Sequence, residues 1–314
     1  MMGLAGLLGT FLIPLFESSV RLAVPLLMAG LGETFSEKSG VINIGLEGIM
    51  LTGAFASFVV TYSSGSPYYG IIVAALMGGV LGLVFAFSTV SLEADQIVAG
   101  TALNMFAMGV TGFLYRKYYG LGGAAATVNT LPQLAIPGLV DIPVLGPVLF
   151  NQNVVVYLAF ALVPVAAVIL KRSSIGISLV ATGEHPKAAD SVGIDVFKVR
   201  YATCVVTGVL AGIGGGFLSV GHANTFFEMM TAGRGFIALA VVIFGKWNPW
   251  GVLGASLLFG GANSFQLRLQ AMGRTIPYHL VLMIPYVLTI LAVAGVSRRR
   301  VNAPRYLGVP YEKT

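Results

Sequence analysis

RSSIGISLVATGEHPKAADSVGIDVFKVR, residues 172–200, is a charged stretch in an otherwise apolar chain. It contains two lysines, two arginines, one glutamate, two aspartates and one histidine. It is flanked on both sides by apolar runs that are long enough to cross a bilayer as helices, for which about 20 residues are needed. The pattern predicts a water-exposed segment between two membrane spans, and we expect a soluble protein to bind there.

The composition of the whole chain predicts a membrane protein. Of its 314 residues, 56% are hydrophobic and 10% are charged, and the mean hydropathy is +0.88. A soluble domain of this length could not bury so many apolar side chains. We therefore predict an all-α polytopic membrane protein with a single transmembrane domain, residues 1–314. No basic residue precedes Arg21, so the first apolar segment is expected to be retained and not cleaved as a signal peptide.

Ten apolar segments, some of them short or broken, are predicted to cross the membrane. They lie at 4–16, 21–36, 42–62, 68–90, 96–118, 153–170, 201–221, 235–246, 251–269 and 277–296. If residues 171–200 lie in the cytoplasm, alternation of the spans puts both termini there and residues 119–152 outside. Twelve of the 18 lysines and arginines then lie inside and six outside, which agrees with the positive-inside rule. The net charge of +6 is thus a topology signal and does not indicate nucleic-acid binding.

The spacing of these segments predicts inverted repeats. Segments two to five overlay on segments seven to ten with an odd offset, so the two halves would have opposite orientations in the membrane. Residues 40–48 and 233–241 both open a third element with closely spaced glycines. Segments 21–36 and 235–246 are too short to cross as single straight helices, a pattern that often marks a binding site. Discontinuous helices in corresponding positions of the two halves would indicate a solute site near the midplane.

Motifs for catalysis, metals and cofactors are not found in this sequence. It has no Gly-x-x-x-x-Gly-Lys-Ser/Thr phosphate loop, no His-Glu-x-x-His pair and no Gly-x-Ser-x-Gly elbow. Its three histidines stand far apart, and Cys204, the single cysteine, has no partner for a disulfide or a thiolate site. We predict no metal, no cofactor and no enzymatic activity, so any ATP must be hydrolysed by another chain. The glycines Gly78, Gly82, Gly208, Gly212 and Gly216, spaced by four, predict close helix packing.

Three polar residues within the predicted spans are candidates for the solute path. Asn43 and Glu47 are four apart and share a helix face, and Asn104 lies in the fifth segment. Alternatively, these side chains form hydrogen bonds between helices, or Glu47 lies close enough to the cytoplasm to be hydrated. The span centres lack basic residues, which favours a neutral polar solute over a phosphate or a carboxylate.

Four stretches together resemble a bacterial ABC importer permease. They are GETFSEKSGVINIGLEGIMLTGAF (32–55), Leu103-Asn104, ATGEHPKAADSVGI (181–194) and GKWNPWGVLGA (245–255). The likeness extends over nearly the whole chain and is greatest to the nucleoside and simple-sugar branch of the superfamily that also holds ribose and branched-chain amino-acid permeases. It implies a bacterial inner-membrane protein that works by alternating access. It also implies three partners: a cytoplasmic ATP-binding subunit, a second permease subunit in a heterodimer, and an extracytoplasmic substrate-binding protein.

The resemblance also assigns residues 183–192 to a short helix that seats in the ATPase. Pro186 can begin such a helix, and Glu184 near its N-terminus is favoured by the helix dipole. The residues expected to couple to the ATPase are Gly183, Glu184, His185, Pro186, Ala188 and Asp190. Outside, the proline-rich loop 119–152 is either a docking surface for the binding protein or a rigid lid.

A second function remains open from the sequence. The chain could be a stand-alone secondary transporter of a small neutral polar solute that uses Glu47 as its proton or sodium site.

Overall fold

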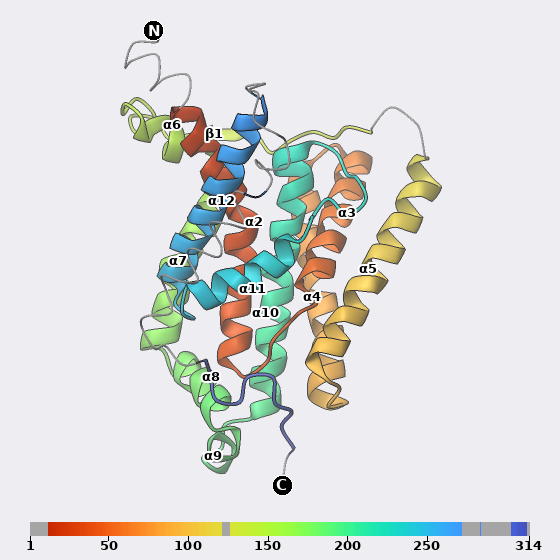
Figure 1. Ribbon diagram of the computed structural model, residues 1–314, viewed down its shortest axis with the longest axis vertical. Helices are drawn as coiled ribbons and strands as arrows, with labels where there is room; N and C mark the ends of the chain where they lie inside the picture. The colour runs from red at the N-terminus through yellow and green to blue at the C-terminus, as the bar shows by residue number, and fades with distance from the viewer. Residues whose placement is uncertain (1–11, 121–125, 272–282, 284–302, 313–314) are drawn as a thin grey trace.

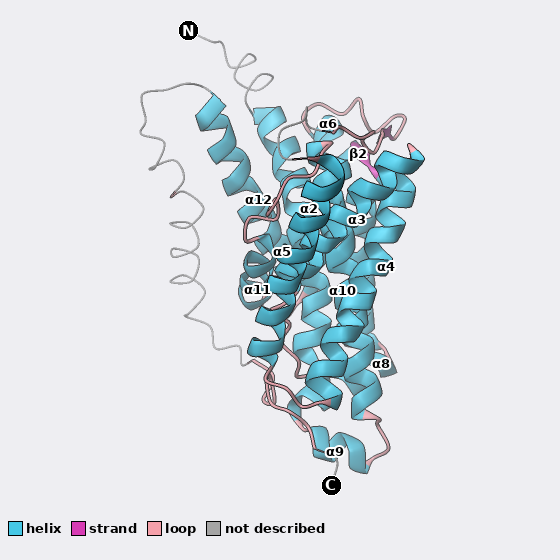
Figure 2. Ribbon diagram, turned by 90° about the vertical axis from the view of Figure 1, so that its right-hand side faces the viewer, coloured by secondary structure: helices cyan, strands magenta, loops and turns pink. Residues whose placement is uncertain are grey.

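The structure, a computed structural model, describes residues 12–120, 126–271, 283 and 303–312, and over these residues it is a helical bundle (Figures 1 and 2). Six of its helices are long and apolar enough to cross a membrane, which confirms a polytopic all-α membrane protein. They are α2 (Ile13–Lys38), α3 (Leu46–Ser64), α4 (Pro67–Ala86) with a π-helical continuation to Ser91, α5 (Gln96–Tyr119), α7 (Val154–Arg172) and α10 (Val196–Phe217) with a π-helical continuation to Ala223. The other helices are α6 (Leu145–Phe150), α8 (Ser174–Glu184), α9 (Pro186–Ser191), α11 (Arg234–Phe244) and α12 (Pro249–Ala271).

Helices α2 and α10 form the centre of the bundle, and their residues are mostly buried, whereas α4, α5 and α7 expose much of their apolar surface. The glycines predicted to mediate close packing do so where α4 crosses α10. A methyl group built on Gly78 would overlap the carbonyl oxygen of Gly208, and one on Gly212 would overlap that of Ala74. The two backbones therefore touch directly, which only glycine permits.

Different parts of the chain gather at the two ends of the bundle (Figure 1). At one end lie α8, α9 and residues 303–312, which we call the C-terminal strap. At the other end lie α6 and a two-stranded antiparallel sheet in which β1 (Gln133–Ala135) pairs with β2 (Asn151–Asn153). The segment 171–200 and the described part of the loop 119–152 thus occupy opposite ends.

Six predicted spans, 42–62, 68–90, 96–118, 153–170, 201–221 and 251–269, agree with α3, α4, α5, α7, α10 and α12 to within about five residues. The predicted short span 235–246 is α11, a helix of 11 residues. The predicted break between 4–16 and 21–36 is wrong, because α2 runs unbroken from Ile13 through it. Glu17, in the gap between the two predicted spans, and Arg21, at the start of the second, form an ion pair one helical turn apart. Most of the first span and the tenth, 277–296, lie outside the described residues.

Candidate solute path and coupling segment

Between α2 and α3 the chain leaves the helix inside the bundle. Residues 39–45, the α2–α3 connection, are mostly buried, and side chains from neighbouring helices bind their backbone N–H groups. Glu33 Oε1 accepts a hydrogen bond from Asn43 N at 2.7 Å, and Gln96 Oε1 accepts one from Ile42 N at 2.8 Å. A buried backbone group without a partner is costly, so these two side chains make a non-helical connection possible within a membrane-spanning bundle.

Two asparagines hold the start of α3. Asn43 Oδ1 accepts from Gly45 N at 2.9 Å. Asn104 on α5 accepts from Gly48 N at 2.7 Å through Oδ1 and donates to Ile44 O at 2.9 Å through Nδ2. The first N–H groups of a helix have no partner within the helix, and the Asn104 side chain supplies one of the missing acceptors from a neighbouring span.

Glu47 joins the start of α3 to the start of α11. Its Oε1 accepts from Gly233 N at 2.8 Å, and its Oε2 accepts from Gly235 N at 2.7 Å. A carboxylate at a helix N-terminus is stabilised by the backbone N–H groups and by the helix dipole. One side chain therefore connects two helices that both begin inside the bundle.

The structure brings the three predicted path residues together around the α2–α3 connection. Asn43, Glu47 and Asn104 are 0%, 3% and 5% exposed, and each makes the hydrogen bonds just described. These contacts are those expected if the three side chains form hydrogen bonds within the protein, which was the alternative interpretation of the sequence. Contact between them and a solute stays a prediction. Among the described residues, the Nδ2 group of Asn43 is a buried donor without a hydrogen-bond partner.

Sequence reasoning missed two buried acids on α2. Glu33 and Glu37 are 0% and 1% exposed, whereas Glu47 was the one acid expected well inside a span. Glu37 Oε2 accepts a hydrogen bond from Trp247 Nε1, which follows α11. Glu33 and Glu37 are four residues apart and so share one helix face, and this spacing was the one sign of a paired role in the sequence. Their hydrogen-bond partners could not be predicted, because Trp247 is distant in the chain and Asn43 N belongs to a non-helical segment.

The coupling segment, residues 171–200, folds as two short helices. The predicted helix start at Pro186 is confirmed, since α9 begins there with His185 as its N-cap residue. Glu184 is the last residue of α8 and lies outside α9. Pro186 and Ala189 are buried, whereas Ala188 is exposed. The short helix therefore has one face packed on the bundle and one face free in this chain.

The remaining predicted coupling residues lie around α9. Gly183 is buried where α8 meets α2, and a methyl group on it would overlap the carbonyl oxygen of Lys38. His185 lies 3.4 Å from Arg305 of the C-terminal strap, measured between Nε2 and Nη1. Asp190 forms a hydrogen bond with Tyr311 of the same strap. The predicted set is thus one continuous region at one end of the bundle.

Comparison with known proteins gives a family. Residues 15–293 match the family described as "Branched-chain amino acid transport system / permease component". The chain belongs to this permease family. It is 41% identical over 302 residues to the guanosine ABC transporter permease protein NupQ of Bacillus subtilis, and the match covers 93% of this chain and 94% of NupQ. It is 38% identical to the nucleoside ABC transporter permease protein NupC of Lactococcus lactis, over the same shares of the two chains.

A more distant relative is named for the same role as NupQ. The permease is 24% identical to the guanosine ABC transporter permease protein NupP, also of Bacillus subtilis, over 77% of this chain and 71% of NupP. No solved structure matches the chain.

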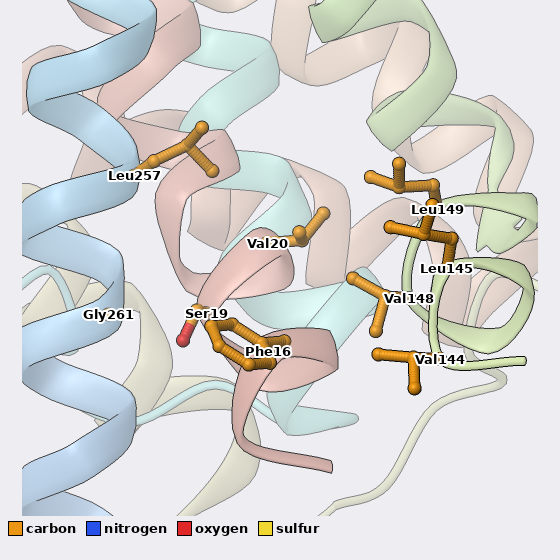
Figure 3. Close-up of a pocket in the computed structure, with 9 residues that line it drawn as sticks. All are labelled: Phe16, Ser19, Val20, Val144, Leu145, Val148, Leu149, Leu257 and Gly261. Atoms are coloured by element: carbon orange, nitrogen blue, oxygen red, sulfur yellow. The ribbon is translucent and has the colours of Figure 1, made fainter. Parts of the chain in front are cut away.

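An apolar groove of about 460 Å³ lies on the permease near α6 (Figure 3). Its walls come from α2, α12 and the segment that contains α6, and Ser19 is the one hydroxyl among its lining residues, which are Phe16, Ser19, Val20, Val144, Leu145, Val148, Leu149, Leu257 and Gly261. The Ser19 hydroxyl already donates to Leu15 O. The groove contains none of the predicted path residues and offers a polar solute almost no hydrogen-bonding groups.

Proposed function

We propose that this chain is the permease subunit of an ATP-binding-cassette importer that carries nucleosides, or related simple sugars, by alternating access. The chain is a multi-pass membrane protein of the permease family, and NupQ and NupC carry guanosine and nucleoside transport in their names. A separate ATPase would supply the free energy. The proposal includes the direction of transport, which is uptake, the solute class, which is nucleosides, and the location, which is the bacterial inner membrane.

The observation that carries the proposal is the form of α9. This six-residue helix lies at one end of the bundle, buries Pro186 and Ala189 against it, and leaves Lys187 and Ala188 exposed. A helix this short has little stability of its own, so the tertiary contacts must hold it. An exposed face on a well-anchored helix is what a soluble ATPase needs in order to push on a membrane subunit.

The proposed topology follows from this assignment. Residues 171–200 and the C-terminal strap would lie in the cytoplasm, and residues 119–152 would lie outside, where a substrate-binding protein docks. The C-terminal strap packs against α8 and α9, which supports a cytoplasmic C-terminus. The predicted cytoplasmic N-terminus lies outside the described residues.

Ten spans in two inverted halves remain part of the proposal. In Figure 1, α2 and α10 run in opposite directions, as do α4 and α12. The two glycine-containing stretches, 40–48 and 233–241, both open helices that begin inside the bundle, and Glu47 joins them. These features support the repeat and a solute path through the α2–α3 connection, with Asn43, Glu47 and Asn104 beside it.

A second permease subunit would complete the path. Bacillus subtilis has two proteins named guanosine ABC transporter permease, NupQ and NupP, and this chain resembles both. The stand-alone secondary transporter is less well supported, because both carboxylate oxygens of Glu47 are engaged by backbone N–H groups.

The test is purification of the tagged permease from its native membrane in mild detergent, followed by mass spectrometry of the proteins that accompany it. We expect an ATP-binding subunit and a second permease. Labelled guanosine, with unlabelled ribose or glucose as competitor, then identifies the solute class. Ala188→Trp enlarges the exposed face of α9 and is expected to abolish both ATPase recovery and uptake. Ser63→Trp, exposed in the last turn of α3 at the opposite end of the bundle, is the matched control. Full uptake by Ala188→Trp would overturn the coupling assignment.

A further inference from the structure

The C-terminal strap contacts three separate parts of the permease. Tyr306 N donates to Gly183 O at 2.9 Å, and Gly308 N donates to Gly40 O at 3.0 Å. Val309 O accepts a hydrogen bond from Arg200 Nη1 at 3.1 Å. The strap thus touches the coupling segment, the α2–α3 connection and α10 within four residues.

A buried tyrosine anchors the strap to α9. Tyr311 is 6% exposed, although it lies close to the end of the chain, and its ring lies 5.8 Å from that of Phe197. It belongs to one apolar cluster with Ala189 of α9 and Val196 of α10. Burial and the hydrogen bond to Asp190 raise the pKa of Tyr311, so the anchor is neutral at physiological pH.

Arg200 connects the strap to the α2–α3 connection. This arginine is 1% exposed, and its guanidinium donates from Nε to Ser39 O at 3.3 Å as well as from Nη1 to Val309 O. A buried guanidinium that lost these acceptors would be strongly destabilising. The backbone of the connection and the backbone of the strap must therefore stay together or move together.

We propose that the strap, residues 303–312, together with Arg200, transmits movement of α9 to the α2–α3 connection. This inference rests on the proposed function, because it assumes that an ATPase moves α9. The strap and Gly183 join α9 and α8 to residues 39 and 40. From there the connection leads through Asn43 to the start of α3, where Glu47 holds α11. Displacement of α9 thereby reaches the proposed solute path.

The test is Gly308→Val. Gly308 has a φ of +79°, and a methyl group there meets only Ile42 Cγ2 at 3.9 Å, so the valine has space but an unfavourable backbone. We expect the ratio of docked to undocked strap to fall about tenfold. Gly65→Val is the matched control, because Gly65 has a φ of +72°, a methyl group there meets nothing within 4 Å, and it follows α3 at the opposite end of the bundle.

Three measurements on the purified transporter complex test this prediction. Hydrogen exchange of the backbone N–H groups at positions 306 and 308 reports docking of the strap. Guanosine uptake into proteoliposomes and ATP hydrolysis report coupling. In Gly308→Val we expect exchange about tenfold faster, uptake reduced in proportion to the docked strap that is lost, and ATP hydrolysis retained, whereas Gly65→Val behaves as wild type. Wild-type uptake in a variant whose exchange shows the strap to be largely undocked would overturn the inference.

A second pair of variants covers the case in which Gly308→Val does not fold. Tyr311→Ala removes the anchor, and Tyr311→Phe keeps its ring. If the strap transmits movement, Tyr311→Ala loses uptake while the ATPase stays bound, and Tyr311→Phe retains most of the wild-type uptake. Equal uptake in the two variants would overturn the inference. If no ATPase accompanies the wild-type permease, the proposed function itself fails, which is a different result.

Discussion

Replacing Glu47 by glutamine keeps the size of the side chain and changes one carboxylate oxygen to an NH₂ group. In the wild type both oxygens accept backbone N–H groups, from Gly233 at 2.8 Å and from Gly235 at 2.7 Å. Glutamine can accept only one of them, and its NH₂ group then faces the other N–H. A hydrogen bond to a charged group contributes about 1.5–3 kcal/mol, and a buried donor left without a partner costs about 1–3 kcal/mol.

Because these two costs overlap, we expect Glu47→Gln to lower the free energy of unfolding by about 2–4 kcal/mol. With about 2–4 °C per kcal/mol, the value for domains of roughly 150–250 residues, the midpoint of thermal unfolding should fall by roughly 4–16 °C. The buried thiol of Cys204 supplies the assay, since a maleimide dye reacts with it only when the protein opens. Purified protein in detergent is heated with the dye, and the midpoint of the fluorescence rise is recorded.

Glu228→Gln is the control, because it removes an exposed ion pair with Arg116 at 3.1 Å, which is worth at most about 1 kcal/mol. Equal midpoints for Glu47→Gln and Glu228→Gln would refute the capping role of Glu47. A normal midpoint together with uptake that no longer depends on a proton gradient would favour the secondary transporter.

The other packing and hydrogen-bond assignments make three further predictions. Asn104→Ala leaves a buried N–H and a buried C=O at the start of α3 without partners, and should lower the same unfolding midpoint by several degrees. Trp247→Phe removes the hydrogen bond to the buried Glu37 carboxylate and should destabilise the protein by about 1–3 kcal/mol in a denaturant titration. Trp250→Phe is the control, because Trp250 is exposed and its replacement should change stability little. Equal effects of the two substitutions would contradict the assignment. Gly208→Val should prevent α4 from packing on α10 and abolish recovery of monodisperse protein on gel filtration, and Gly109→Val, where a side chain meets nothing, should not.

The sequence predicted the limits of α4 and α5 closely because residues that favour a helix start stand at the beginning of each. α4 begins at Pro67, and α5 begins after Asp95, whose carboxylate accepts hydrogen bonds from the N–H groups of Ile97 and Val98. The long apolar runs between such markers leave little choice of structure in a membrane.

The same reasoning placed a false break in α2 between residues 16 and 21, where Glu17 and Arg21 interrupt the apolar sequence. Their ion pair lies along the helix, and Arg21 also donates to Gln152 Oε1 beside β2. A sequence window contains no information about such a distant partner.

Sequence reasoning selected the three candidate path residues but could not predict their geometry. Asn43, Glu47 and Asn104 were selected because polar side chains are rare in spans, and the structure places all three at one break. What they bind is mostly backbone exposed by that break, including the start of α11, which lies more than 180 residues away from Glu47 along the chain. Pattern and spacing describe side chains, whereas the partners here are N–H groups that become available only when a helix begins inside the bundle.

The crossing of α4 and α10 has a consequence for movement. Side chains that interdigitate can repack when two helices slide, but Gly78 and Gly208 meet through their backbones, and a shift of one residue would bring a side chain against a carbonyl group. The pair has a single register and moves as one rigid body. Any change of shape during a transport cycle must therefore occur outside this pair, and the non-helical residues 39–45 and 224–233 are candidates, because side-chain hydrogen bonds there can exchange partners without loss of backbone packing.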